Sequence, residues 1–280
     1  MPVVAPKRRP SRTAVGVAAS RAAHQMLDGE PKILDDPIAA RLIDASDRRL
    51  IATNPPGLQE PGARRLRAHV LLRSRHAEDR LRAAARRGVG QCVILGAGLD
   101  TFAYRQPNWA RRLRIFEVDH PSTQADKRAR LAKAGVAVAD NVEFVAIDFE
   151  TMSLREGLRA SHVDFSKAAF FSCLGVLVYL SAEAADDVFR LVAGFPAGSE
   201  IVFTFARPDS ALSGVGRRAA DAGEPWRTHF SQEALKVKLR DLGFRVVSFL
   251  SPAQAARAFQ GRTDGLAAPA RCSIAAAGVG

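Results

Sequence analysis

The sequence predicts an α/β fold: a doubly wound sheet of seven strands behind an all-helical N-terminal segment. From residue 91 onward, short apolar runs alternate with stretches of helical character, as expected for buried strands joined by crossover helices. The run 93–95 ends in Gly96-Ala97-Gly98, and the run 115–116 ends in Glu117-Val118-Asp119. Glycines after one strand and a carboxylate at the tip of the next are typical of a nucleotide pocket.

The chain before the glycine loop is predicted to be helical behind a short tail. Residues 1–12 are rich in proline, lysine and arginine with few apolar residues, so we expect a disordered tail. Residues 13–90 form the helical segment. Its expected parts are a helix over 12–27, a helix from Asp36-Pro37 to Asp44 with an acidic N-cap, a break at 54–57, and one long helix over 60–87 that ends at Gly88.

Residues 91–280 are predicted to form one α/β domain. The expected strands are 91–95, 114–119, 142–148, 168–176, 199–206, 244–250 and 272–277. The expected helices are 121–134, 181–195 and 230–242, and the last two begin with a serine cap followed by an acidic residue. Gly135 and Gly243 stand where helices should end.

Composition narrows the class of protein. No apolar run approaches the roughly 20 residues of a membrane span, so no membrane partner is expected. The three cysteines lie in apolar runs without metal-ligand spacing, which indicates reduced thiols in a cytoplasmic protein and no metal site.

The net charge of +12 is uneven: residues 1–90 hold 18 Lys and Arg against 9 Asp and Glu, and residues 91–280 hold 23 against 20. A basic segment of this kind is compatible with nucleic-acid binding. We favour the interpretation that these arginines lie on solvated helix faces, as in 64–67 and 80–82. Nucleic-acid binding is disfavoured because no aromatic residues interleave with the arginines as stacking platforms.

The glycine loop also discriminates between cofactors. Its pattern is Gly-x-Gly-x-x-Thr, with Thr101 at the place of the third glycine of the dinucleotide fingerprint. This favours S-adenosylmethionine, which has a ribose but no pyrophosphate, over a nicotinamide cofactor. A nicotinamide-dependent oxidoreductase on a similar sheet remains an alternative.

Several motifs occur in an order and spacing that carry a family resemblance. They are Ser11-Arg12-Thr13-Ala14, Asp36-Pro37-Ile38-Ala39, Arg73-Ser74-Arg75 with Glu78-Asp79, residues 93–101, 116–121, 144–149 and 175–180, Gly223-Glu224-Pro225, and residues 262–266. With them the chain resembles the leucine carboxyl methyltransferase-like family of S-adenosylmethionine-dependent methyltransferases, in particular its bacterial small-molecule O-methyltransferase branch. The resemblance extends from about Ser11 to the C-terminus.

The resemblance implies a seven-strand, Rossmann-like class I methyltransferase sheet with an antiparallel last strand and a helical N-terminal lid over the cofactor. It also implies roles for cofactor-binding residues. Arg73 would hold the methionine carboxylate, Gly96 and Gly98 would approach the methionine portion, Asp119 would accept from the ribose hydroxyls, and Asp148 with the Phe149 backbone would read the adenine edge. Leu174 stands where phosphatase-directed members carry an acidic residue, which speaks against phosphatase methylation. Arg21 would take the place of a basic lid residue.

Some of these residues also have simpler interpretations. Asp119 and Asp148 could each cap the helix that follows, and Gly96 and Gly98 could form only a tight turn. Trp226 and His229 lie in an insertion that either shapes an acceptor pocket or is an ordinary loop.

The sequence therefore predicts transfer of a methyl group to an oxygen of a small molecule. A carboxylate acceptor needs no general base, whereas for a phenol or alcohol the candidates are His120 and His229. The alternatives are the oxidoreductase, a nucleic-acid methyltransferase, and a scaffold that has lost activity.

Overall fold

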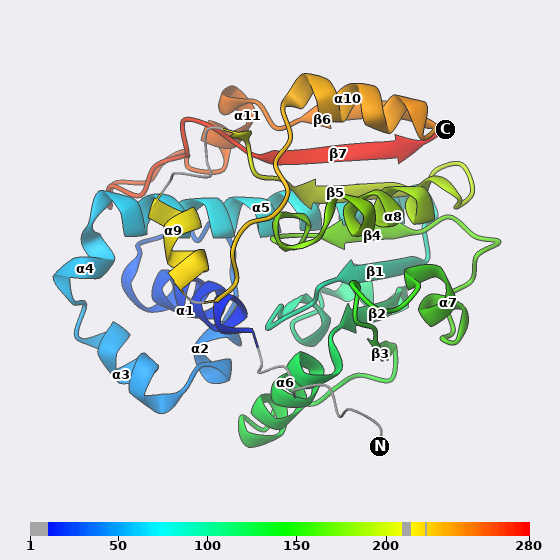
Figure 1. Cartoon of the computed structure of the whole chain (residues 1–280). Coiled ribbons are helices and arrows are strands. Elements are labelled where there is room, and N and C mark those ends of the chain that lie inside the picture. The colour runs from blue at the N-terminus through cyan, green and yellow to red at the C-terminus, as the bar shows by residue number, and fades with distance from the viewer. Residues whose placement is uncertain (1–10, 209–213, 222) are drawn as a thin grey trace, which may run out of the picture.

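The computed structural model describes residues 11–208, 214–221 and 223–280 of the chain. Its centre is a seven-stranded sheet in the order β3-β2-β1-β4-β5-β7-β6 (Figure 1). The strands are β1 (Gln91–Leu95), β2 (Arg114–Asp119), β3 (Val142–Ala146), β4 (Phe170–Cys173), β5 (Glu200–Thr204), β6 (Phe244–Phe249) and β7 (Ile274–Val279). Strands β1 to β5 pair in parallel, and β7 is antiparallel to both β5 and β6. The predicted fold class, including the antiparallel last strand, is confirmed.

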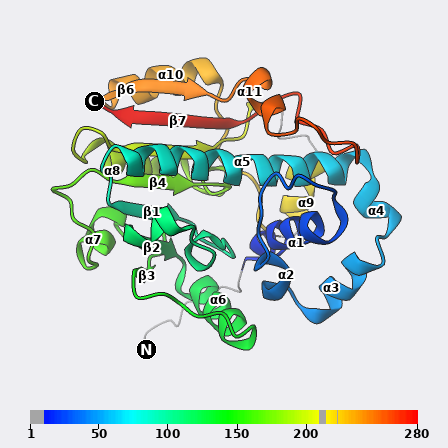
Figure 2. The same ribbon diagram turned by 180° about the vertical axis from the view of Figure 1, so that it is seen from behind.

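Helices cover both faces of this sheet. Helix α5 (Pro61–Arg86) runs along one face (Figure 2), where Leu71 and Leu81 join a buried cluster with Ile94, Phe170 and Val202 of the strands. The other face packs against α7 (Leu154–Arg159), α8 (Ala182–Ala193) and α10 (Gln232–Asp241) through a second buried cluster. A sheet buried on both faces explains why its strands read as continuous apolar runs.

The remaining helices flank these layers. They are α1 (Arg12–Leu27), α2 (Ala39–Leu42), α3 (Ala45–Ala52), α4 (Pro56–Gln59), α6 (Pro121–Lys133), α9 (Gly214–Asp221) and α11 (Pro252–Arg257), with three 3-10 helices, η1 (Phe102–Tyr104), η2 (Asn108–Arg112) and η3 (Leu177–Tyr179). None of the helices in the described ranges is long and apolar enough to cross a membrane.

The N-terminal segment differs from the sequence prediction in three places. Residues 1–10 of the expected tail lie outside the described residues, but Ser11 is the N-cap of α1 and Arg12 is its first residue. The helix expected from Pro37 to Asp44 is only the four-residue α2. The expected break at 54–57 instead contains the start of α4, with Pro56 in its first turn.

Asp36 stands just before α2, and its side chain joins separate segments of the chain. Its carboxylate accepts hydrogen bonds from the Ala39 N–H (3.1 Å) and from the Thr101 hydroxyl (2.6 Å), and it lies 3.2 Å from Nε of Arg21. The side chain is fully buried. It therefore serves a tertiary network that joins α1 to the loop after β1, and the N-cap of α2 is Ile38, not the expected acidic residue.

The strand over 168–176 is also shorter than expected, because the chain leaves the sheet after Cys173. Gly175 adopts a left-handed conformation (φ 75°), and η3 follows it. A residue with positive φ does not fit an extended strand, and glycine accepts this conformation at little cost. The helices α3, α4, α7, α9 and α11 were not predicted from the sequence.

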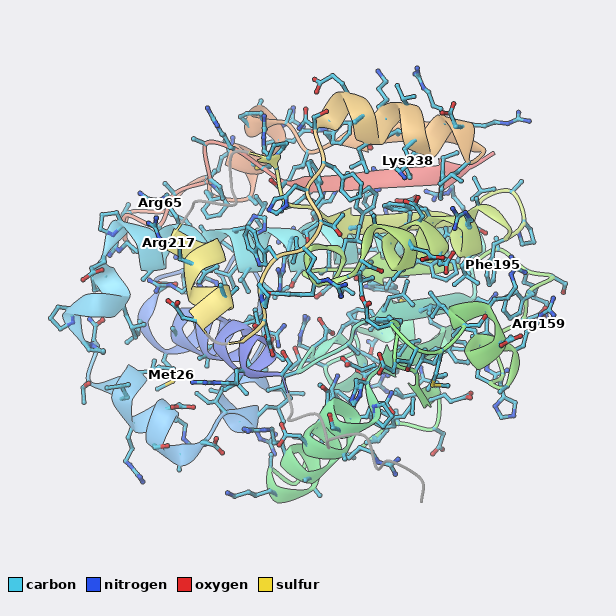
Figure 3. The ribbon with its side chains drawn as sticks, in the orientation of Figure 1. Met26, Arg65, Arg159, Phe195, Arg217 and Lys238 are labelled. Carbon is cyan, nitrogen blue, oxygen red and sulfur yellow. The ribbon has the colours of Figure 1, made fainter. Side chains whose placement is uncertain are left out.

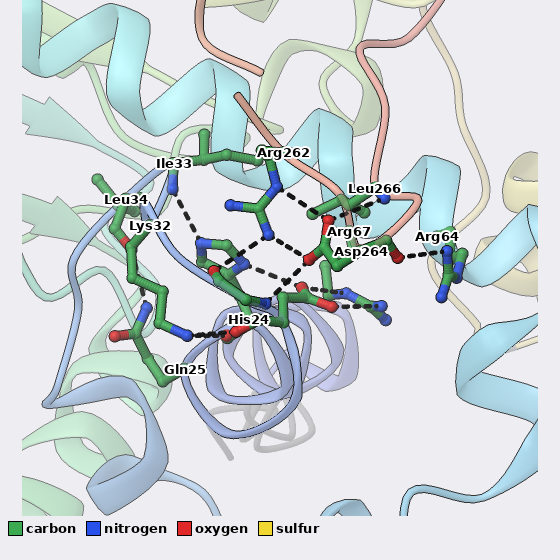
Figure 4. A network of polar contacts seen from close by, with 12 residues as sticks. His24, Gln25, Lys32, Ile33, Leu34, Arg64, Arg67, Arg262, Asp264 and Leu266 are labelled. Carbon is green, nitrogen blue, oxygen red and sulfur yellow. Dashed lines mark hydrogen bonds and ion pairs between the residues drawn. The ribbon is translucent and has the colours of Figure 1, made fainter. Parts of the chain in front are cut away.

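A buried polar network fixes the C-terminal end of α1 (Figure 4). Arg67 of α5 makes two hydrogen bonds to the Asp28 carboxylate, 2.8 and 3.0 Å long, and His24 lies 2.9 Å from the same carboxylate. Asp264, which follows α11 in the chain, accepts a hydrogen bond from the Gly29 N–H (2.9 Å), and Arg262 pairs with Asp264. Segments from both ends of the sequence are thereby joined at this point.

Candidate functional site

A cavity of about 520 Å³ opens at the carboxyl ends of the parallel strands, where ligands bind in doubly wound sheets. Its floor includes the ends of β1 and β2 with the glycine loop. Its other walls come from α1, from Arg73 of α5, from residues 147–150 and 174–180, and from residues 223–227. All six residues that the sequence analysis assigned to cofactor binding line this cavity: Arg73, Gly96, Gly98, Asp119, Asp148 and Phe149.

Asp119 links the tips of the first two strands. Its carboxylate accepts hydrogen bonds from the Gly98 N–H (2.5 Å) and from the His120 N–H (2.7 Å). Burial raises the pKa of this carboxyl above its ordinary value, against the lowering effect of those two N–H groups. The N-cap of α6 is His120, whose imidazole accepts from the Ser122 N–H (3.2 Å). The alternative that Asp119 caps α6 is therefore wrong.

The two glycines of the loop are required by neighbouring protein atoms. Gly96 and Gly98 have positive φ values, 64° and 45°. A Cβ on Gly96 would lie 2.2 Å from Cγ2 of Val176, and one on Gly98 would lie 3.3 Å from Cβ of Ala14 in α1. The loop is thus held tightly between α1 and the segment after β4, which fixes its backbone at the cavity wall.

Asp148 lies at the other side of the cavity, beyond β3. Its Oδ1 accepts from the Glu150 N–H (3.1 Å), and its Oδ2 lies 3.7 Å from Nε2 of His120. The N-cap of α7 is Ser153, so Asp148 stabilises a turn and does not cap that helix. Phe149 packs against the neighbouring core cluster.

Arg73 presents a positive charge to the cavity, and within the described ranges no carboxylate forms an ion pair with it. Its Nε is buried and has no hydrogen-bond partner among the described residues. The carboxylate of Asp100, which lies near enough to act on Arg73, pairs with Arg21. Burial, together with the charge of Arg21, lowers the pKa of Arg73 to about 10. A guanidinium in this state is suited to the carboxylate of a ligand.

Arg21, the expected basic residue of the N-terminal lid, lies in α1. It lines the cavity, but its guanidinium donates to the Leu99 carbonyl and pairs with Asp36 and Asp100. Its role in the structure is to join α1 to the loop after β1.

The two candidate histidines have different positions. His120 lines the cavity, and its Nδ1 lies 2.8 Å from the Ser122 hydroxyl. His229 is not among the lining residues; its backbone forms a bridge with Ala206, and its Nε2 is buried without a partner among the described residues. The structure therefore brings His120, and not His229, to the cavity. Trp226 lies beside His229, with ring centroids 6.5 Å apart, and is also outside the lining.

Sequence reasoning gave no role to Glu224, Arg227 or Glu150, although all three line the cavity. Glu224 contacts the first turn of α1, more than 200 positions away in the chain. The only local signal was a charged residue between Gly223 and Pro225, which does not indicate its partner.

Many arginines of the basic N-terminal segment are internal or paired. Arg67 is buried against Asp28, and Arg80 pairs with Glu200, so the expected solvated faces at 64–67 and 80–82 are only partly exposed. Figure 3 shows Arg159 on α7 far from Arg65 on α5 and Arg217 on α9. The formal charge therefore overstates the strength of a basic surface.

No group of three or more His, Cys, Asp or Glu side chains that could hold a metal ion occurs in the described ranges. The three cysteines are buried free thiols. Burial raises the pKa of Cys173 to about 12, so this thiol is a packing residue and not a nucleophile.

The fold and the site together define a class I S-adenosylmethionine-dependent methyltransferase. The chain belongs to the leucine carboxyl methyltransferase family, whose model matches residues 14–193. It is similar to YktD of Bacillus subtilis, provisionally named an S-adenosyl-L-methionine-dependent methyltransferase, with 33% identity over 88% of this chain and 90% of that protein. A protein of Mycolicibacterium paratuberculosis with the same provisional name is 34% identical over 84% of each chain.

Solved structures share the fold. A crystal structure from Thermobifida fusca, provisionally named a methyltransferase, has a TM-score of 0.57 and 21% identity over 97% of this chain and 95% of that one. A DUF574 family protein from Streptomyces avermitilis has a TM-score of 0.54 and 16% identity over 94% and 97% of the two chains. The cofactor expected from the sequence, S-adenosylmethionine, agrees with the names of the relatives.

Proposed function

We propose that this protein transfers the methyl group of S-adenosylmethionine to an oxygen atom of a small molecule. The observation that carries the proposal is one cavity whose walls hold both the guanidinium of Arg73, whose Nε has no partner among the described residues, and the half-buried carboxylate of Asp119. A cation for a carboxylate and an anion for a diol match the two polar ends of the methionine–ribose portion of the cofactor.

The residues present fit this cofactor. Arg73 would hold its carboxylate, and the rigid backbone at Gly96 and Gly98 would lie along its methionine portion. Asp119 would accept hydrogen bonds from its ribose hydroxyls, and Asp148 with Phe149 would bind the adenine. When bound, S-adenosylmethionine supplies a methyl group that is already activated on a positively charged sulfur.

The protein's own contribution is to orient the acceptor and exclude water. Helix α1 and residues 223–227 cover the cavity as the expected N-terminal lid would, together with a second element from the C-terminal half. The remaining wall has an apolar part that includes Val17, Leu174, Val176 and Leu180. Such a wall suits a small organic acceptor better than a charged polymer.

The acceptor oxygen belongs to a carboxylate or a hydroxyl group. A carboxylate is already a nucleophile and needs no base. For a hydroxyl acceptor, His120 is the candidate base that lines the cavity, and Asp148, 3.7 Å from its Nε2, would stabilise the imidazolium.

The test is a calorimetric titration of the purified protein with S-adenosylmethionine, S-adenosylhomocysteine and NADH. We expect micromolar binding of both sulfur cofactors and none of NADH. Small carboxylic acids and phenols would then be incubated with the protein and labelled S-adenosylmethionine, and methylated products would be identified by mass spectrometry. Binding of NADH alone would favour the oxidoreductase, and methylation of nucleic acid but of no small molecule would overturn the proposed acceptor class.

A further inference from the structure

The carboxylate of Glu224 binds the N-terminal turn of α1. Oε1 accepts from the Arg12 N–H (3.1 Å), and Oε2 accepts from the Thr13 N–H (3.2 Å), from the Ser11 hydroxyl (3.3 Å) and from the Thr13 hydroxyl. Ser11 also caps the helix by accepting from the Ala14 N–H (3.1 Å). The first turn of a helix has free N–H groups and a partial positive charge, so an anion here makes strong contacts.

Residues 223–227, here called the strap, are also fixed at their other end. The Arg227 N–H donates to the Val178 carbonyl (2.7 Å), and the Arg227 guanidinium lies 3.1 Å from Glu150. Glu150 follows closely after Asp148 and accepts a hydrogen bond from the Ser181 N–H (3.0 Å). The strap therefore spans the cavity from α1 to the wall beyond β3.

The strap begins at a residue suited to be a hinge. Gly223 has a φ of 81°, its N–H donates to the Ala220 carbonyl (2.9 Å), and the Glu224 N–H donates to the Ala219 carbonyl (2.9 Å). This is the Schellman arrangement that ends a helix, here α9. Figure 1 shows α9 in yellow next to α1 in blue. A glycine with positive φ between α9 and Glu224 permits backbone rotation at little energetic cost.

Helix α1, by contrast, is held firmly along its length. The Asp28–Arg67 pair and the contacts of Asp264 fix its C-terminal end (Figure 4), and Arg21 ties its middle to Asp36 and the Leu99 carbonyl. If the cover over the cavity opens, the strap is the part that moves, and both its contacts to α1 through Glu224 and its contacts through Arg227 must break.

We propose that Glu224 is a positioning residue that fastens the strap to α1 and so keeps the cavity closed during methyl transfer. This inference rests on the proposed function. With the Glu224 contacts made, α1 and the strap form a continuous cover that excludes water. With the contacts broken, the strap turns about Gly223 and lets the cofactor and the demethylated product exchange.

The first test measures the rate at which S-adenosylhomocysteine leaves its complex with the full-length protein, by competition in a stopped-flow instrument. In Glu224→Ala we expect release to be roughly tenfold faster, because hydrogen bonds to a charged group are lost. Glu224→Gln keeps one acceptor oxygen and the shape of the side chain. Its rate of S-adenosylhomocysteine release should lie between the rates of Glu224→Ala and the wild type. Glu183→Ala is the control, since Glu183 is an exposed glutamate in the first turn of α8.

The outcomes separate the two proposals. Wild-type protein that does not bind S-adenosylhomocysteine contradicts the proposed function. Wild-type protein that binds it, with the same release rate in folded Glu224→Ala, contradicts the role of Glu224 alone.

A second test does not depend on how well Glu224→Ala folds. Thr13→Cys and Glu224→Cys are combined, and the two thiols are joined by a short bifunctional reagent; the native cysteines are buried and provide a wild-type control for the reagent. Linking before S-adenosylhomocysteine is added should block its uptake, and linking afterwards should slow its release at least roughly tenfold. A linked protein that exchanges the ligand at the unlinked rate overturns the proposal.

Discussion

The Gly98 N–H donates a hydrogen bond to the carboxylate of Asp119, and this contact joins the loop after β1 to the tip of β2. The second carboxylate oxygen accepts from the His120 N–H. Two backbone groups thus set the orientation of a side chain that lies half-buried in the cavity wall. Such preorganisation favours binding, because little conformational freedom remains to be lost when a diol arrives.

Asp119→Ala should weaken the binding of S-adenosylhomocysteine roughly 10- to 100-fold, because hydrogen bonds to a carboxylate contribute about 1.5–3 kcal/mol. The dissociation constant is measured by titration calorimetry. Asp140→Ala is the control, since Asp140 is exposed in the loop before β3. Unchanged affinity in a folded Asp119→Ala protein would exclude a ribose-binding role for this carboxylate.

The affinity for S-adenosylhomocysteine should depend on pH through Asp119. Only the ionised carboxylate offers all its oxygen lone pairs to the ribose hydroxyls. Burial raises its pKa, so affinity present at neutral pH should be lost as the pH falls through that raised value, earlier than for an aspartate of ordinary pKa 3.8. Calorimetry over a pH series checks this. In Asp119→Asn the affinity should be low and this acid dependence absent; an equally steep decline in that variant would assign the titration to another group.

Arg73→Met should reduce the affinity for S-adenosylhomocysteine by roughly 100-fold, because a carboxylate would lose a charge-assisted, two-bond partner. The same change should leave the affinity for adenosine, which has no carboxylate, nearly unaltered. Arg82→Ala, at an exposed position of the same helix, is the control for lost positive charge. Equal losses for both ligands would mean that Arg73 shapes the whole cavity and does not bind the carboxylate.

Gly175→Ala tests the position of the Arg73 guanidinium. A Cβ at residue 175 would lie 2.7 Å from Nη1 of Arg73, so the guanidinium must move, and the φ of 75° is unfavourable for alanine. Gly135 has a similar φ of 60° but no atom within 4 Å of an added Cβ. Both variants should lose about 1–2 kcal/mol of unfolding free energy, measured with denaturant, but only Gly175→Ala should bind S-adenosylhomocysteine several-fold more weakly. Equal affinity in the two variants would contradict the importance of this close contact.

The sheet and its glycine loop could be predicted because their signals are local. Apolar runs ending in Gly96-Ala97-Gly98 and in Asp119 define strand ends, and parallel pairing then brings those ends together. The role of Arg73 could not be predicted from the local sequence, because nothing distinguishes one arginine from the many others on a long helix. The family resemblance singled it out, and the structure shows it at the cavity.

The errors share a physical cause, which is contact between segments remote in sequence. Asp36 was expected to cap the second helix, but it is buried against Arg21 and Thr101, and Ile38 is the N-cap. His229 looked like a candidate base, but the chain turns it away from the cavity lining. Glu224 finds its partners 211 to 213 positions away, so no periodicity or spacing rule could reveal them.

The Asp28–Arg67 pair offers a test of how α1 is held. The side chains are 6% and 2% exposed and make a two-bond contact, and His24 lies against the same carboxylate. Removing one partner leaves the other charge buried without compensation, so Arg67→Met should lower the unfolding free energy by about 3–5 kcal/mol. The double variant Arg67→Met/Asp28→Asn should lose less unfolding free energy than the sum of the losses in the two single variants, because no unpaired charge is left buried. Denaturant unfolding measures the free energy of the two single variants, Arg67→Met and Asp28→Asn, and of the double variant.

Arg75→Ala, which breaks an exposed pair with Asp79, is the control and should change the unfolding free energy by less than about 1 kcal/mol. A loss in Arg67→Met no larger than in Arg75→Ala would show that this pair does not hold α1 in place.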